Sequence, residues 1–395
     1  MQGSIRDKVA IIGTGITKFG EHWDEEVGSM LINAVHEACA EANVDLQKDV
    51  EAGWVSTLYD FSGMSGWALA EPLRFYGKPI TRVENQCASG MDAVRNAAYA
   101  VAAHQYDIVV ACGVEKVFDQ GGRGLSQDIL YWHPSLTWQA APAYFAPSAI
   151  RAFKEWGWTQ EDLARVAVKN HFNGAKHPKA HFRREITLET VLNAPLVSYP
   201  LTLFDCCALS EGAAAVIVTR PELAKELVGD NFATIKALSL SVETQWPFFQ
   251  PDWKGLSFPA TVKAAEDAYK EAGITDPRKE LDFGIVHDCF TITELLTYQD
   301  MRLCGPGEGA ELIRSGVTAI DGAFPIGPDG GLKCFGHPVG ATGVRMIAEL
   351  SKQVLGRAEG YQVKDARAGF AHNLGGPQAI AAVVIVGTPD WEAGG

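Results

Sequence analysis

The sequence has little positive charge and no long hydrophobic run. It holds 34 lysines and arginines against 48 aspartates and glutamates, a formal net charge of −14 at pH 7. A protein that binds nucleic acid or anionic membrane normally presents a basic surface, so neither is an expected partner. The longest apolar run, residues 379–386, is less than half of the ~18–20 residues that a membrane-spanning helix needs. The first seven residues lack the apolar core of a signal peptide, so none is expected.

The cysteines also lack a recognisable pattern. Eight are present, at positions 39, 87, 112, 206, 207, 289, 304 and 334, and none belongs to a Cys-x-x-Cys pair. In a chain of 395 residues this spacing predicts neither a disulfide framework nor a zinc site. We therefore expect reduced thiols, no bound metal and a cytoplasmic location.

What the sequence does contain is typical of an α/β enzyme. Short apolar runs bounded by glycine alternate with helical patterns, which predicts a doubly wound α/β architecture. The expected strands are residues 9–13, 107–113, 212–219, 283–286, 368–373 and 379–387. The expected helices are residues 29–42, 90–104, 259–272, 290–302 and 343–355.

The chain repeats itself weakly. Residues 34–44 align with residues 264–274, and each stretch is an expected helix followed about ten residues later by a strand. Residues 88–90 and 341–343 each open an apolar helix. Two duplicated halves, the second starting near Ala233, would explain both matches, and so would chance similarity between alanine-rich helices.

Residues 118–200 do not follow this alternation of expected strands and helices. Within residues 169–184 there is no acidic side chain, although the whole protein is acidic. The cluster is either a solvated helix and loop face or a pocket for a phosphate-bearing ligand. Its basic residues are Lys169, Lys176, Lys179, Arg183 and Arg184.

Four short segments could carry chemistry. Cys87 precedes a helix of small residues, where free backbone N–H groups stabilise a thiolate, although a lone cysteine is often only a small buried hydrophobe. His337 stands in a glycine-rich loop, either as a base for such a thiol or as part of a helix cap. His287 and Cys289 follow an expected strand, where ligands gather in α/β sheets. Residues 373–376 (Asn-Leu-Gly-Gly) could present the amides of Gly375 and Gly376 to an oxyanion or form a plain turn.

Together these segments resemble the thiolase superfamily over essentially the whole chain. The similar motifs are residues 86–90 (Gln-Cys-Ala-Ser-Gly), 200–215, 336–343 (Gly-His-Pro-Val-Gly-Ala-Thr-Gly) and 373–376. The His-Asp-Cys-Phe sequence at 287–290 is similar to the branch of sterol-carrier-protein-type and acetoacetyl-CoA thiolases.

The resemblance implies a thiolase fold, in which two βαβαβαββ halves form a five-layer αβαβα sandwich. The first half would be residues 1–117 and 201–232, the inserted loop domain residues 118–200, and the second half residues 233–395. It also implies a homodimer or dimer of dimers and an acyl-CoA substrate, with coenzyme A passing the basic cluster and no permanently bound cofactor.

The resemblance implies a role for each site residue. Cys87 would carry the acyl group, His337 would take its proton, and His287 would help bind the thioester oxygen of the second substrate. The amides of Cys87 and Gly375 would form the other oxyanion hole. Relatives usually have a cysteine where this chain has Asn373, so Cys289 would supply the missing acid–base thiol.

The expected function is a CoA-dependent C-acyltransferase that cleaves 3-ketoacyl-CoA or condenses acyl-CoA with acetyl-CoA. One alternative is a thiolase-like aldolase or acyltransferase subunit for a bulky, steroid-type CoA ester, working with a small OB-fold partner. The aromatic segment 131–145 would then line the pocket. Another alternative is a scaffold that has kept the motifs without activity, which the retention of both cysteines and both histidines disfavours.

Overall fold

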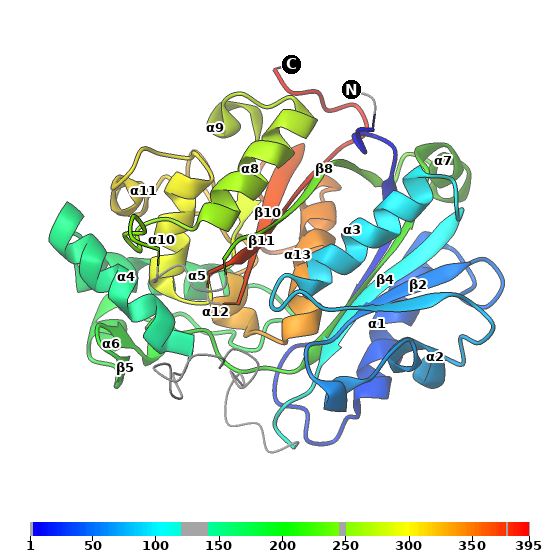
Figure 1. The fold of residues 1–395 in the computed structure, drawn as a ribbon, viewed down its shortest axis with the longest axis horizontal. Helices are drawn as coiled ribbons and strands as arrows, with labels where there is room; N and C mark the ends of the chain where they lie inside the picture. The colour runs from blue at the N-terminus through cyan, green and yellow to red at the C-terminus, as the bar shows by residue number, and fades with distance from the viewer. Residues whose placement is uncertain (1–2, 120–140, 245–249, 377, 395) are drawn as a thin grey trace.

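One mixed sheet of nine strands organises the molecule (Figure 1). The computed structural model describes residues 3–119, 141–244, 250–376 and 378–394. The strand order is β3-β2-β4-β7-β1-β8-β11-β10-β9. The strands are β1 (Ala10–Ile16), β2 (Ala52–Ser56), β3 (Ile80–Val83), β4 (Ile108–Glu115), β7 (Gly212–Thr219), β8 (Ala233–Val242), β9 (Phe283–Ile285), β10 (Ala368–Gly375) and β11 (Ile380–Gly387).

The two halves of this sheet repeat one topology. In the first half β2 runs parallel to β4, β4 antiparallel to β7 and β7 antiparallel to β1. In the second half β9, β10, β11 and β8 follow the same order with the same directions. The halves meet where β1 pairs with β8 through only two residue pairs, Ala10 with Thr234 and Ile11 with Ala233. This confirms the duplicated α/β fold and shows that the two half-sheets touch edge to edge.

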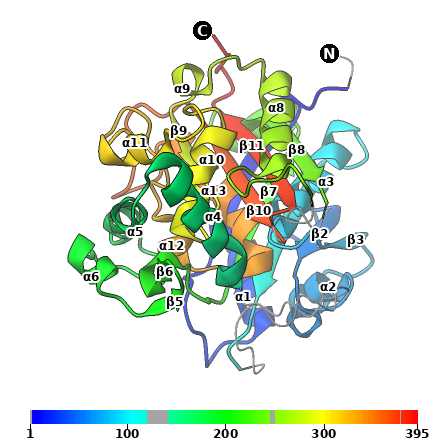
Figure 2. The same cartoon turned by 60° about the vertical axis from the view of Figure 1, so that its left-hand side comes forward.

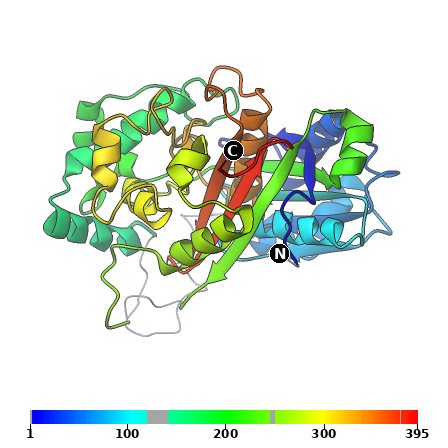
Figure 3. The ribbon, with the colours of Figure 1, turned by 90° about the horizontal axis from the view of Figure 1, so that it is seen from above.

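The helices form layers around the half-sheets (Figures 1 and 2). Helices α3 and α13 pack on each other and lie between the half-sheets, α1 covers the outer face of the first and α8 that of the second. Figure 3 shows the first half, coloured blue to cyan, beside the green and red strands of the second. The helices are α1 (Val27–Ala42), α2 (Trp67–Leu73), α3 (Ser89–Ala102), α4 (Ala141–Trp156), α5 (Gln160–Gly174), α6 (Leu188–Leu192), α7 (Pro221–Val228), α8 (Pro259–Ala272), α9 (Pro277–Glu280), α10 (Thr291–Asp300), α11 (Gly309–Arg314), α12 (Gly331–Phe335) and α13 (Val339–Val354). No helix among the described residues combines the length and apolarity needed to cross a bilayer.

The halves differ in how their last two strands are connected. Only four residues, 376–379, separate β10 from β11 along the chain, whereas α4, α5, α6 and the small sheet of β5 (Leu196–Ser198) and β6 (Leu201–Thr202) lie between β4 and β7. This insertion falls within the segment predicted as a loop domain, whose boundaries stay a prediction. Residues 120–140, which include most of the aromatic segment 131–145, lie outside the described residues.

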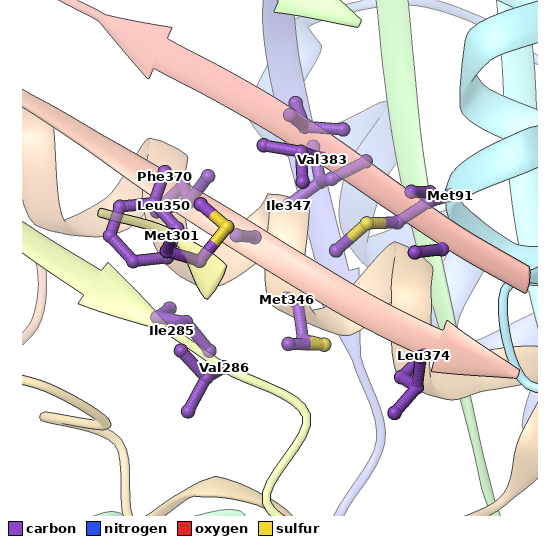
Figure 4. Packing of buried hydrophobic residues seen from close by; sticks show 14 of the residues in the cluster. Met91, Ile285, Val286, Met301, Met346, Ile347, Leu350, Phe370, Leu374 and Val383 are labelled. Atoms are coloured by element: carbon purple, nitrogen blue, oxygen red, sulfur yellow. The ribbon is translucent and has the colours of Figure 1, made fainter. Parts of the chain in front are cut away.

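The central layer packs tightly because its helices begin with small residues. A methyl group on Gly343 would come within 2.3 Å of the Met91 backbone nitrogen, so the starts of α3 and α13 touch backbone to backbone. Around them Met91, Met346 and Val383 belong to one buried apolar cluster (Figure 4). Close packing of this kind fixes the starts of α3 and α13 relative to each other.

Candidate active site

The turn that carries Cys87 is held in an unusual backbone conformation. Gln86 has φ of 51°, a left-handed value that few residues other than glycine adopt. The Ser89 hydroxyl donates to the Gln86 carbonyl and accepts a 2.8 Å hydrogen bond from the Asn85 N–H. The turn therefore fixes Cys87 immediately before α3, at the positive end of the helix dipole.

Two histidines from the second half face this thiol. The donor atoms of Cys87, His287 and His337 all lie within 4.8 Å of one another. The two imidazole rings meet edge to face, with centroids 4.9 Å apart. Residues that are 250 positions apart in the sequence are thus brought into one small cluster, which the sequence predicted for these three residues.

Hydrogen bonds fix the protonation of His337. Thr342 Oγ1 donates to the Pro338 carbonyl at 2.9 Å, so it accepts from His337 Nδ1 at 2.8 Å. The proton of a neutral His337 is therefore on Nδ1, and Nε2, which has no hydrogen-bond partner among the described residues, keeps a free lone pair. A free imidazole nitrogen beside a thiol is a base ready to accept its proton.

His287 has the opposite arrangement. The Asn373 side-chain amide donates to His287 Nδ1 at 2.8 Å, which leaves the proton of the neutral ring on Nε2. His287 can therefore donate a hydrogen bond into the site. Asn373, which the sequence placed in the site without a proton-transfer role, sets this orientation.

The turn after β10 closes the site from the other side. The Gly376 backbone amide lowers the pKa of the Cys87 thiol, although burial, which raises this pKa, is the larger effect. A side chain on Gly375 would lie 3.0 Å from the Cys87 backbone nitrogen, so this part of the turn packs closely against the cysteine. Gly375, which the sequence analysis assigned to the oxyanion hole, is the last residue of β10 and lies beside the Cys87 backbone nitrogen, and its role stays a prediction.

Cys289 lies beside a third thiol, that of Cys207. An antiparallel bridge pairs Cys206 with Phe290, and the Cys207 N–H donates to the Cys289 carbonyl at 2.7 Å. Cys207 therefore stands opposite Cys289, and Thr293 Oγ1 lies 3.6 Å from the Cys289 sulfur. No local pattern singles out Cys207, since only the pairing of two distant segments brings it beside Cys289.

Burial keeps the site neutral. It raises the pKa of Cys87 to about 12 and that of Cys289 well above its usual value. Burial, aided by the charge of Arg345, lowers the pKa of His337 to about 3, and burial also lowers the pKa of His287. At neutral pH the resting pair is thus a thiol and a neutral imidazole.

Glu115 binds the start of α13, which follows His337. Its buried carboxylate accepts hydrogen bonds from the N–H groups of Leu58, at 2.9 Å, and Gly340, at 3.0 Å. Burial raises the pKa of Glu115 to about 7 against the effect of these hydrogen bonds. The sequence analysis missed this residue, because its partners are far apart along the chain.

The basic cluster does not form one open face. Lys169 is buried and pairs with Glu294, and Lys179 pairs with Glu37 at 2.5 Å. Lys169 is therefore wrong as a phosphate ligand, because its charge is already neutralised inside the protein. Lys176, Arg183 and Arg184 are exposed, and Lys176 lies over the Phe172 ring.

The thiol and the two imidazoles could also ligate a metal ion, being the one such group among the described residues. Acyl transfer, however, needs the same three atoms as nucleophile, base and hydrogen-bond donor. An ion bound there would block that chemistry.

A nucleophilic thiol, a histidine base and glycine amides, set where two duplicated α/β halves meet, define a cysteine-dependent acyltransferase class. Comparison with known proteins makes the assignment specific. Residues 9–222 match the family model "Thiolase, N-terminal domain" and residues 249–388 match "Thiolase C-terminal domain-like". The chain belongs to the thiolase family.

Individual relatives agree with this. The acetyl-CoA acetyltransferase of Methanothermobacter thermautotrophicus is 37% identical over 95% of this chain and 98% of its own length. Sterol carrier protein 2 of Oryctolagus cuniculus is 29% identical over 97% of this chain and 73% of its length. A solved structure, the Ltp2-ChsH2(DUF35) aldolase, superposes with a TM-score of 0.86 at 25% identity over 98% of this chain and 100% of that one.

Proposed function

We propose that this thiolase is an acetyl-CoA C-acyltransferase. It cleaves a 3-ketoacyl-CoA with coenzyme A, or condenses an acyl-CoA with acetyl-CoA, through an acyl group carried on Cys87. The observation that carries the proposal is the free His337 Nε2 beside the Cys87 thiol.

The first step forms the acyl-enzyme. His337 Nε2 takes the Cys87 proton and the thiolate attacks the ketone carbon of the substrate. The amides of Cys87 and Gly375 bind the resulting oxyanion. The carbon–carbon bond then breaks, and its electron pair leaves as the enolate of acetyl-CoA.

The second step protonates that enolate. The N–H groups of His287 and of the newly protonated His337 face its oxygen, and the Cys289 thiol gives its proton to carbon. Asn373 is an amide and cannot do this, so it acts by orienting His287. The Cys289 thiolate takes the proton of the coenzyme A thiol, and the resulting CoA thiolate attacks the acyl-cysteine. Acyl-CoA leaves, and His337 returns its proton to the Cys87 sulfur.

Coenzyme A is a substrate in this reaction and no permanently bound cofactor is needed. Of the predicted phosphate ligands, Lys176, Arg183 and Arg184 remain the candidates, because their side chains are exposed. Lys179 could contribute only by giving up Glu37.

We further propose a homodimer, or a dimer of dimers, in the cytoplasm. β3 is an edge strand of the sheet, and large apolar side chains are exposed in the segments around it. Trp67 is 68% exposed, and Met64 and Tyr76 are also exposed. An open strand edge bordered by apolar side chains favours pairing with a second copy. A role in lipid metabolism would follow from the acyl-CoA substrate.

A second candidate is an aldolase that works with a small OB-fold partner. The favouring observation is the superposition on the Ltp2-ChsH2(DUF35) aldolase over the full chain. Release of an aldehyde from a 3-hydroxyacyl-CoA, by this chain alone or with such a partner, would establish it. The Cys87 nucleophile favours the thiolase.

The deciding experiment is thiolysis of acetoacetyl-CoA and of a longer 3-ketoacyl-CoA by the purified chain. Turnover should be lost in Cys87→Ala and in Cys289→Ala. Cys304→Ala, which removes a half-buried thiol that the proposed mechanism does not use, should retain it. Full activity in Cys87→Ala would refute the acyl-cysteine mechanism.

A further inference from the structure

Lys333 differs from every other buried lysine among the described residues. Four lysines are buried, and Lys116, Lys169 and Lys236 each lie within ion-pair distance of a carboxylate. Lys333, only 2% exposed, has no described carboxylate within that distance. Its Nζ donates instead to the backbone carbonyls of Asp205, at 2.5 Å, and Cys289, at 3.5 Å.

The neighbouring carboxylates are engaged elsewhere. Asp205 accepts hydrogen bonds from Thr202, Thr291 and Gln160. Asp288 accepts from the Leu332 N–H at 2.6 Å, the Lys333 N–H at 3.1 Å and the Asn170 amide at 2.8 Å. A buried ammonium without a carboxylate partner costs several kcal/mol, so its position calls for a compensating role.

The local sequence places Lys333 behind Cys289. Gly331 has φ of 60°, and a side chain there would meet the Asp288 carboxylate at 2.5 Å, so only glycine lets α12 dock on Asp288. Asp288 immediately precedes Cys289 in the chain. The segment that carries the ammonium and the segment that carries the thiol are therefore fastened to each other.

Thiols, together with Asp288, are the groups around Lys333 that can become negatively charged. Burial raises the pKa of Cys206, Cys207 and Cys289, and the Lys333 charge opposes this rise at each of them. Cys289 is also faced by Cys207 and Cys87, which raise its pKa further, and by the Thr293 hydroxyl, which lowers it. The groups that Lys333 acts on electrostatically are Cys206, Cys207, Cys289, Cys334, Asp288 and His171.

We propose that Lys333 is the counter-ion of the thiolate that Cys289 becomes after giving its proton to the substrate carbon. It is a positioning residue, since it acts through Cys289 and does not touch substrate. The inference rests on the acid–base role of Cys289 in the proposed function. It explains how a buried thiol among other thiols can carry a negative charge during turnover.

The test separates the two half-reactions. Acylation of Cys87 by acetyl-CoA, followed by intact mass, does not use the Cys289 proton. Exchange of the methyl protons of acetyl-CoA with D2O does use it. Lys333→Gln keeps a side chain that can donate to a carbonyl but removes the charge, so exchange should fall on the order of tenfold to a hundredfold while acylation stays within a few-fold.

Two further variants complete the experiment. Lys333→Arg keeps the charge and should recover part of the exchange rate. Lys236→Met removes a buried lysine that pairs with Asp7 away from the thiols. It should lower the stability of the protein but leave the ratio of the exchange rate to the acylation rate unchanged. The exchange of Lys333→Gln should also reach half its maximum at a higher pH than that of the wild type.

Several outcomes would overturn the proposal. The proposal fails if the exchange rate of Lys333→Gln is unchanged, or if that variant loses exchange and acylation equally. It also fails if a folded Lys333→Arg recovers none of the exchange rate. If Cys289→Ala itself retains exchange, the acid–base role in the proposed function fails, which is a separate result.

Discussion

The two helices of the central layer begin alike but supply different chemistry. The residues before Cys87 and His337 both have a positive φ, 51° at Gln86 and 76° at Gly336. A glycine near each helix start touches the other helix, Gly90 in α3, three residues after Cys87, and Gly343 in α13, six residues after His337.

The repeat that aligns residues 88–90 with residues 341–343 places Cys87 opposite Gly340, so His337 stands three residues earlier in its half than Cys87 does in the other. The thiol and the imidazole therefore reach one site from different positions of the two repeats. The turns before Cys87 and His337 also differ in whether they leave room for a side chain. A side chain at Gly336 would come within 2.0 Å of Ser210 Oγ, so glycine is required there, whereas the first half accommodates Gln86.

The largest expected effect comes from removing the imidazole of His337, which faces the Cys87 thiol. His337→Ala removes both the base for Cys87 and one oxyanion donor, and should slow acylation of Cys87 by about 100- to 1,000-fold, about 2.7–4 kcal/mol. Rapid-quench acylation with acetyl-CoA measures it. His36→Ala, on the exposed face of α1, is the control and should acylate normally. A loss below tenfold would mean that His337 is not the base.

A smaller effect should follow from separating the two helix starts. Gly343→Ala places a methyl group 2.3 Å from the Met91 backbone nitrogen and 2.7 Å from the Asn373 side-chain oxygen. Because backbone must move, we expect destabilisation by about 3 kcal/mol, seen as a lower urea midpoint. Gly20→Ala, whose added methyl would meet nothing closer than 3.8 Å, should leave the midpoint within error. Equal midpoints for the two variants would show that the helices do not depend on this contact.

The smallest effect is a difference in pH dependence between the two halves. Burial lowers the pKa of His337 to about 3, so between pH 6.5 and 3 the unfolded chain binds a proton there that the folded chain does not. Stability therefore falls as the pH drops through this range. Between pH 7 and pH 5 the wild type should lose about 2 kcal/mol more than His337→Asn, by urea unfolding at both values. Replacing Cys87 by serine should leave this slope unchanged, because burial keeps the Cys87 thiol protonated throughout. Parallel slopes for wild type and His337→Asn would contradict a buried neutral imidazole.

The sequence predicted most of the fold where burial leaves a clear pattern. Residues 212–219 and 259–272 coincide with β7 and α8, a continuous apolar strand and an amphipathic helix. β3 and β8 were not among the predicted strands. β3 is an edge strand with Thr81 and Arg82 in it, and β8 contains the buried Lys236, so neither shows an uninterrupted apolar run.

The residues of the site also differ in how far the sequence could predict their place. Cys87, His287 and His337 stand in motifs with local signals, and the structure brings all three together. Lys169 stood in a stretch without acids, but its partner Glu294 is 125 residues away and no local pattern reveals it. The places of Cys207 and Lys333 depend likewise on pairing between segments that only the folded chain brings together.

The placement of nucleophile and base on opposite halves has a consequence for the chain while it is being made. Cys87 leaves the ribosome 250 residues before His337 and almost 290 before Gly376, and the two half-sheets share only two residue pairs at β1 and β8. A nascent first half therefore holds the thiol without the histidines that face it in the folded chain. In the proposed mechanism Cys87 gains its base only when the second half has folded, so acyl transfer would begin with the finished protein and not with its fragments.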